Sequence, residues 1–162
     1  MIYVDIDGVL RDLCGAAGIN PTTWNCKIGK EEQSFTDYFT EHTWMLVIAR
    51  TTEYFEAINF YHRFIDNIVL LSMQPKSWQE YTEIWLSQHF EDVPPIIYTS
   101  NKLDYLTHKD DLLIEDNPNL SDYLKILLID RPYNQEINLP HKRVNSPRQL
   151  IDELLRRKYE LK

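Results

Sequence analysis

Two aspartates one residue apart, Asp5 and Asp7, follow a short apolar run at the start of the chain and precede Gly8. Side chains of successive strand residues point to opposite faces, so these carboxylates can act together only if the chain turns directly after Asp5. Gly8 provides the conformational freedom for such a turn. An unpaired charge at the end of a buried strand is costly, which disfavours the alternative that the two acids merely flank a turn.

A second acidic pair, Glu115 and Asp116, follows the apolar run 112–114. If that run is a strand of the same sheet, four carboxylates reach one sheet edge, and such crowding of like charges requires a cation. Oxygen ligands suit Mg²⁺, which keeps several waters and is completed by substrate phosphate. If the run is not a strand, the two acids form an ordinary solvated turn.

Ser72 and Lys102 each follow an apolar run as well. Taken singly, a serine at a strand end caps a turn and a lysine lies at the surface. At neighbouring strand ends, the lysine can instead hold a phosphoryl group as a point charge. A hydroxyl, an ammonium group and Mg²⁺ form a minimal binding site for a transferring phosphoryl group.

The elements that must position these residues alternate between apolar strands and patterned helices. The sequence predicts strands at 1–5, 66–72, 95–99, 112–115 and 126–129, and helices at 51–64, 77–90 and 147–159, with a short helix starting near Pro118. Continuous apolar strands alternating with helices predict an α/β fold, a Rossmann-like parallel sheet with helices on both faces. In such sheets, ligands bind outside the carboxyl ends of the strands.

One stretch, about 13–45, does not follow this alternation and is rich in aromatic residues. We expect a single domain over 1–162, with a core of 1–12 and 46–162 and a small cap insertion after the first strand. The aromatic side chains of the insertion could stack on a nucleobase or form a small core of their own; they are Trp24, Phe35, Tyr38, Phe39 and Trp44. Residues 45–49 fit either an extra strand or the start of the following helix.

These motifs resemble those of the haloacid dehalogenase-like phosphatases. The segments 5–10 (DIDGVL), 70–72 (LLS), Lys102 and 113–116 (LIED) resemble the four motifs of that superfamily, in the same order. Within the superfamily, 71–75 (LSMQP), 111–118, 131–134 (RPYN) and 143–146 are most similar to the 5'(3')-deoxyribonucleotidases. The likeness covers nearly all of the Rossmann-like part and does not cover the insertion.

The resemblance implies a magnesium-dependent phosphomonoesterase that releases phosphate from nucleoside monophosphates through an aspartyl-phosphate. It implies that Asp5 is the nucleophile and that Asp7 is the proton donor and later the base, which suits a displacement split into two steps. Mg²⁺ would be held by Asp5, the backbone carbonyl of Asp7 and Asp116, with Glu115 supporting or replacing Asp116. Glu115 departs from the aspartate usual in these nucleotidases and leaves the choice of ligand open. Ser72 and Lys102 would bind the phosphate.

Composition limits the partners. With 17 basic and 25 acidic side chains, the formal net charge of −8 argues against extended nucleic acid as a ligand, but not against a small phosphorylated substrate. Cys14 and Cys26 match no zinc spacing and are expected to be reduced structural thiols. No secretion signal and no membrane span are visible, so we expect a cytoplasmic protein.

Other functions are compatible with the same residues. The substrate could be a sugar phosphate, another small phosphate ester or, least expected, the 3'-phosphate end of a nucleic acid. A receiver-like signalling domain also combines acids, a hydroxyl and a lysine at strand ends, but its second strand would not end in Ser72. A non-catalytic module could bind a phosphorylated ligand without turnover. The oligomeric state does not follow from the sequence.

Overall fold

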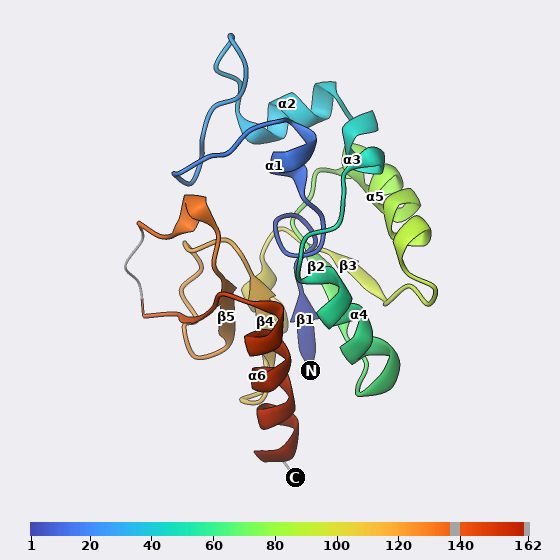
Figure 1. Cartoon of the computed structure of the whole chain (residues 1–162), viewed down its shortest axis with the longest axis vertical. Coiled ribbons are helices and arrows are strands. Elements are labelled where there is room, and N and C mark those ends of the chain that lie inside the picture. Colours follow the sequence, from blue (N-terminus) through green and yellow to red (C-terminus); the bar gives the residue numbers. More distant parts are fainter. Residues whose placement is uncertain (137–139, 161–162) are drawn as a thin grey trace.

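A computed structural model of the protein describes residues 1–136 and 140–160. Its centre is one all-parallel sheet of six strands in the order β3-β2-β1-β4-β5-β6 (Figure 1). The strands are β1 (Ile2–Val4), β2 (Val69–Ser72), β3 (Ile96–Tyr98), β4 (Leu112–Glu115), β5 (Ile126–Ile129) and β6 (Lys142–Val144). This sheet confirms the predicted α/β, Rossmann-like architecture.

The direction of strand addition reverses between β1 and β4, which are hydrogen-bonded neighbours. This order is the 3-2-1-4-5-6 order of a Rossmann sheet, whereas receiver-like domains have the order 2-1-3-4-5. The topology therefore argues against the receiver-like alternative. In sheets of this type, ligands bind at the point of reversal, outside the carboxyl ends of the strands. Asp5 and Glu115 lie at that point.

Three α-helices cover one face of the sheet: α4 (Phe55–Phe64), α5 (Lys76–His89) and α6 (Pro147–Glu160). Their buried side chains, such as Ile58, Trp85 and Leu150, pack in one apolar cluster with inward-facing strand residues that include Val4 and Ile114. The helices begin and end within about four residues of their predicted positions. No helix in the described part of the chain has the length and apolar character needed to cross a membrane.

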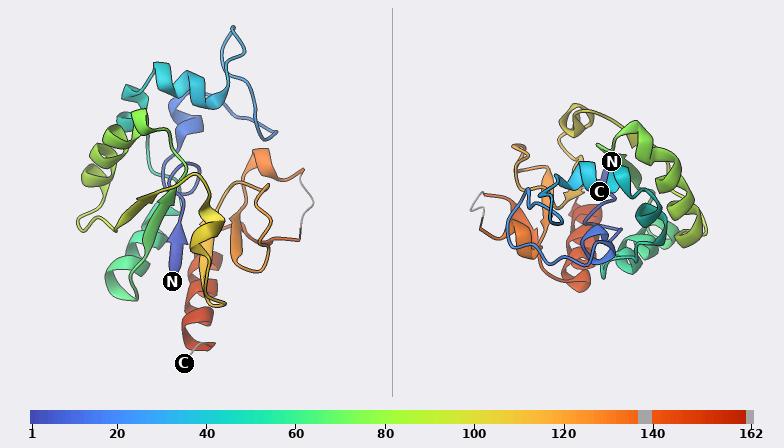
Figure 2. Two further views of the ribbon diagram at one scale, coloured as in Figure 1. Left: turned by 180° about the vertical axis from the view of Figure 1, so that it is seen from behind. Right: turned by 90° about the horizontal axis from the view of Figure 1, so that it is seen from above.

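The opposite face has no α-helix among the described residues, so the prediction of helices on both faces holds for α-helices on one face only. It is covered by the 3₁₀ helix η1 (Lys102–Tyr105) and by loops, whose Leu106 and Leu120 pack on Leu71 and Leu113 (Figure 2). The predicted short helix starting near Pro118 is wrong, because 116–125 contains only turns and bends. Ten residues leave little room for a helix between β4 and β5, and the Asn117 side chain accepts the backbone N–H of Asn119 in a turn instead.

Two other regions differ from the prediction. Residues 142–144 form the edge strand β6, which was not predicted, because Val144 is its one buried residue and gives no strand pattern. Residues 45–49, which fitted a strand or a helix, lie mostly in the short helix α3 (Trp44–Ile48). That helix is neither a strand nor the start of α4, because a bridge residue, Thr51, and a turn at 53–54 separate the two helices.

The stretch 13–45 lies beyond the carboxyl ends of the strands, at the top of Figure 1. It holds the short helices α1 (Leu13–Ala16) and α2 (Phe35–Glu41). Phe39 is fully buried in a second apolar cluster with Leu46 from α3 and Trp78 from α5. The segment thus packs on the Rossmann-like part through a small core of its own, next to the strand ends.

Candidate functional site

A tight loop carries Asp5 and Asp7. Asp5 follows β1, where its N–H donates to the carbonyl of Ile114, and the N–H groups of Leu10 and Arg11 both donate to the carbonyl of Ile6. Gly8 has a φ of +82°, in the region that favours glycine, and a Cβ there would lie 1.9 Å from Oδ2 of Asp116. The turn after Asp5 is therefore as predicted. Gly8 is required both for the turn and for the close approach of Asp116.

Three buried carboxylates meet beside this loop: Asp5, Glu115 and Asp116, each with an oxygen within 4.8 Å of the others. With Lys102, we call them the acidic cluster. Lys102, also buried, places its Nζ 2.7 Å from Oδ1 of Asp5 and 2.6 Å from Oε2 of Glu115. One ammonium group thus faces three carboxylates, and the formal charge is −2 when all are ionised. Buried charge of one sign in this excess is unfavourable without a further cation.

The pKa values of the cluster reflect this imbalance. Burial and the nearby charge of Glu115 raise the pKa of Asp5 well above its ordinary value, and the same two causes raise that of Asp116. Burial also tends to raise the pKa of Glu115, but the charge of Lys102 and hydrogen bonds outweigh it and lower that pKa. Attraction to Asp5 and Glu115 outweighs the effect of burial on Lys102 and raises its pKa. Glu115 and Lys102 are therefore paired. The negative charge that has no positive partner is shared by Asp5 and Asp116.

Hydrogen bonds distinguish Glu115 from Asp116. Both oxygens of Glu115 have partners, because Oε2 binds Lys102 and Oε1 accepts the backbone N–H groups of Asp116 and Asn117, each at 3.0 Å. Asp116 accepts the hydroxyl of Tyr133 at 2.5 Å through Oδ2. Tyr133 lies in the 3₁₀ helix η2 (Pro132–Asn134), and the Asn134 amide fixes the backbone carbonyl of Asp116 at 2.8 Å.

Asp7 lies outside the acidic cluster and has partners of its own. Its Oδ1 is 2.7 Å from Nε of Arg11, and its Oδ2 accepts the side-chain amide of Gln74 at 2.6 Å. The structure therefore separates the two aspartates by environment. Asp5 lies among acids and a lysine, and Asp7 is paired with a buried guanidinium group.

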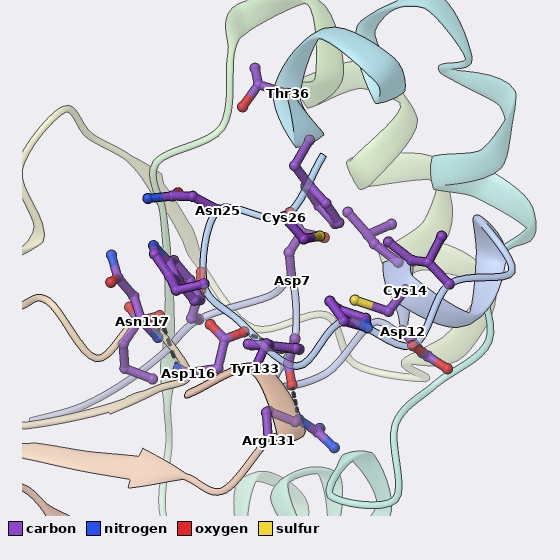
Figure 3. A pocket seen from close by; sticks show the side chains of 18 of the residues that line it. Asp7, Asp12, Cys14, Asn25, Cys26, Thr36, Asp116, Asn117, Arg131 and Tyr133 are labelled. Carbon is purple, nitrogen blue, oxygen red and sulfur yellow. Dashed lines mark hydrogen bonds between the residues drawn. The ribbon is translucent and has the colours of Figure 1, made fainter. Parts of the chain in front are cut away.

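All six predicted site residues line one cavity of about 530 Å³, between the strand ends and the segment 13–45: Asp5, Asp7, Ser72, Lys102, Glu115 and Asp116. Ser72 is buried at the end of β2. Figure 3 shows Asp7, Asp116 and Tyr133 below Asn25, Cys26 and Thr36 of the segment 13–45. Cys14 and Cys26 are free thiols that also line the cavity, and burial raises the pKa of Cys14 to about 12.

The aromatic residues of the insertion divide into two groups. Trp24 and Phe35 line the cavity, and Trp24 packs on Tyr133 with ring centroids 5.8 Å apart. Phe39 and Tyr38 belong to the second apolar cluster and do not line the cavity. Phe35 also packs on that cluster, with its ring centroid 4.9 Å from that of Phe39. Trp44 is 54% exposed and does not line the cavity. Only the first two are therefore placed to contact a ligand.

Several polar residues at the site were not predicted to belong to it. Arg11, Gln74 and Tyr133 bind the predicted acids, and Arg131 donates from Nε to the carbonyl of Gly8 at 2.8 Å. Arg11 follows the apolar Val9 and Leu10 but is next to Asp12, so the sequence around it gives no clear sign of a buried, paired charge. The roles of the other residues depend on contacts between distant segments.

No protein-family model and no curated protein sequence matches this chain.

Proposed function

We propose that this protein is a magnesium-dependent phosphomonoesterase that acts through an aspartyl-phosphate. The observation that carries this proposal is the convergence of buried acids, Lys102 and Ser72 from separate strand ends on one cavity beside Asp7. A nucleophile, a separate proton donor and cationic support for the phosphoryl group are the parts that a two-step phosphoryl transfer needs. The likeness to haloacid dehalogenase-like phosphatases supports the same assignment.

In the first step, a carboxylate oxygen of Asp5 attacks phosphorus, the ester P–O bond breaks, and its electron pair leaves with the alcohol oxygen. The carboxyl group of Asp7 gives that oxygen its proton. In the second step, Asp7 as carboxylate takes a proton from water, the water oxygen attacks phosphorus, and the bond to Asp5 breaks. The net change is the ester plus water to the alcohol plus inorganic phosphate.

Asp5 and Asp116 are the carboxylates proposed to hold Mg²⁺, together with the backbone carbonyl of Asp7. The buried negative excess of the acidic cluster and its oxygen-only donors fit a hard divalent cation. Glu115 is assigned a supporting role, since its two oxygens already bind Lys102 and two backbone N–H groups. The bound ion would neutralise charge on the phosphoryl group.

We propose a nucleoside monophosphate as the substrate, in keeping with the resemblance to the 5'(3')-deoxyribonucleotidases. The cavity volume suits a small phosphate ester, and Trp24, Phe35 and Tyr133 offer aromatic surface to a planar base. A sugar phosphate is the second candidate, because the cavity also presents polar side chains such as Asn25 and Asn117.

Hydrolysis of p-nitrophenyl phosphate with and without Mg²⁺ tests the reaction. We expect Mg²⁺-dependent release of p-nitrophenol that falls by more than about 1,000-fold in Asp5→Asn, since loss of a nucleophile abolishes the covalent route. A folded, Mg²⁺-loaded protein with no turnover, but with saturable phosphate binding, would instead indicate the non-catalytic module.

A panel of nucleoside monophosphates and sugar phosphates, with released phosphate measured, tests the substrate. We expect the highest kcat/KM for a nucleoside monophosphate and a rise in KM when Trp24 is replaced by alanine. Good turnover of a sugar phosphate beside poor turnover of every nucleotide contradicts the nucleotidase assignment and leaves the reaction class intact.

A further inference from the structure

A closed ring of side chains surrounds Asp7. Its members are Asp7, Arg11, Thr82 of α5 and Gln74. Arg11 Nε lies 2.7 Å from Asp7 Oδ1, and its NH2 group donates to the Thr82 hydroxyl at 3.1 Å. That hydroxyl donates to the Gln74 carbonyl at 2.7 Å, and the Gln74 amide donates to Asp7 Oδ2 at 2.6 Å. Both oxygens of Asp7 are therefore held by donors that are themselves fixed.

The ring is anchored in the protein interior on one side. Arg11 and Thr82 have no exposed surface. The third nitrogen of Arg11, Nη1, donates to the carbonyl of Leu46 at 3.1 Å, and its guanidinium lies 5.6 Å from the centre of the Trp85 ring. A buried guanidinium group is stable only with such partners. The interior half of the ring is thus rigid, and it fixes the orientation of the Asp7 carboxylate.

The other side of the ring reaches the cavity. Asp7 and Gln74 line it, whereas Arg11 and Thr82 do not. Oδ1 of Asp7 faces Arg11, which does not line the cavity, and Oδ2 faces Gln74, which does; we therefore assign Oδ2 to the cavity side. A carboxylate oxygen has more than one acceptor direction, so Oδ2 can bind the Gln74 amide and still carry a proton toward a substrate oxygen.

We propose that Arg11, Gln74 and Thr82 are positioning residues that aim Oδ2 of Asp7 at the leaving-group oxygen of the phosphate ester. The proposal rests on the proposed phosphomonoesterase function. In the first step, the P–O bond to the leaving group breaks and the proton moves from Oδ2 to that oxygen. Misplacing a proton donor by a fraction of an ångström weakens this transfer while leaving phosphate binding and the nucleophile intact.

The experiment compares two esters that differ in their need for the proton. Phenolate leaves poorly and requires protonation, whereas p-nitrophenolate leaves readily without it. We expect Gln74→Met and Thr82→Val to lower kcat/KM for phenyl phosphate at least about ten-fold more than for p-nitrophenyl phosphate, at saturating Mg²⁺. Arg11→Lys keeps the charge but loses the forked donors, and the same selective loss is expected.

The matched control is Ser87→Ala, which also removes a hydroxyl from α5, at an exposed position. It should leave both rates unchanged. Urea unfolding of each variant verifies that it is folded before its rates are compared. Equal losses on both esters, or no loss on either, overturn the positioning role. If the wild-type protein hydrolyses neither ester, the proposed function itself fails, so the two failures are distinguishable.

Discussion

Two groups of charged residues differ in their ratio of carboxylates to cations, and the difference indicates which of them is a functional site. The acidic cluster sets three carboxylates against one lysine, at the strand ends. On α6, beside the edge strand β6, Glu153 is a single carboxylate, 7% exposed, that binds three cations: Lys142, Arg156 and Arg157. We call these four residues the Glu153 cluster.

The difference lies in the charge balance. The partly exposed cations of the Glu153 cluster keep contact with water, so its charges are satisfied without a ligand. The acids of the acidic cluster are buried, and raised pKa values for Asp5 and Asp116 show that ionisation there is unfavourable. A buried carboxylate is therefore not in itself a sign of function. A group of buried carboxylates that lack enough cations and line a cavity is such a sign.

The largest effect is expected from removing the one cation of the acidic cluster. Lys102→Met leaves three buried carboxylates without a positive partner, and the free energy of unfolding should fall by about 3–5 kcal/mol in the presence of a chelator. Urea unfolding at neutral pH measures it. The matched change is Lys142→Met, which leaves Glu153 with two arginines and should cost less than about 1 kcal/mol. Similar losses in the two variants would remove the distinction between the clusters.

Magnesium should act on one cluster only. Binding of Mg²⁺ to the folded chain at about 100 times its Kd stabilises it by about 2.7 kcal/mol, and the melting temperature rises. In Asp116→Asn, this response should be lost, because a proposed ligand is gone. Glu153→Gln should retain it in full. A wild-type protein that does not respond, or an Asp116→Asn variant that responds equally, would contradict the assignment of the ion to the acidic cluster.

The placement of Asp5, Ser72 and Glu115 could be predicted because continuous apolar runs precede them. Such runs indicate buried parallel strands, and parallel strands bring their carboxyl ends to one edge whatever the details of packing. The strand order, and with it the neighbourhood of β1 and β4, fixes which ends meet. The strand order is partly implied by the resemblance to the phosphatases, but no single apolar stretch of the sequence reveals it.

The ring around Asp7 could not be predicted, for a physical reason. Arg11 is four residues from Asp7, a spacing that more often gives an exposed pair on a helix. Its burial depends on Leu46, Thr82 and Trp85, which reach it from distant segments. Likewise, β6 forms by pairing with β5, although Lys142 and Arg143 give no apolar pattern.

The smallest expected effect is the pH dependence of the Glu153 cluster. Burial tends to raise the pKa of Glu153, but hydrogen bonds from Arg156, Lys142 and Arg157 outweigh it and lower the pKa from 4.5 to about 2. A lowered pKa in the folded state stabilises the protein above the unfolded-state value, and this stability is lost as the pH falls from about 4.5 toward 2. The Glu153→Gln variant lacks this pH-dependent contribution to the free energy of unfolding.

Chemical unfolding of wild type and Glu153→Gln between pH 6 and the acid limit of folding, with a chelator present, measures the difference. The full pKa shift corresponds to about 3.4 kcal/mol. Water screens the partly exposed cations of this cluster, so we expect the wild-type advantage to shrink by less, about 2 kcal/mol, as the pH falls through this window. Asp116→Asn should give a difference of opposite sign. Because the folded-state pKa of Asp116 is raised, the wild-type protein gains stability relative to the variant as the pH falls through that pKa. Two difference curves with the same slope would show that the clusters are electrostatically alike, and the charge imbalance would then no longer single out the cavity as the functional site.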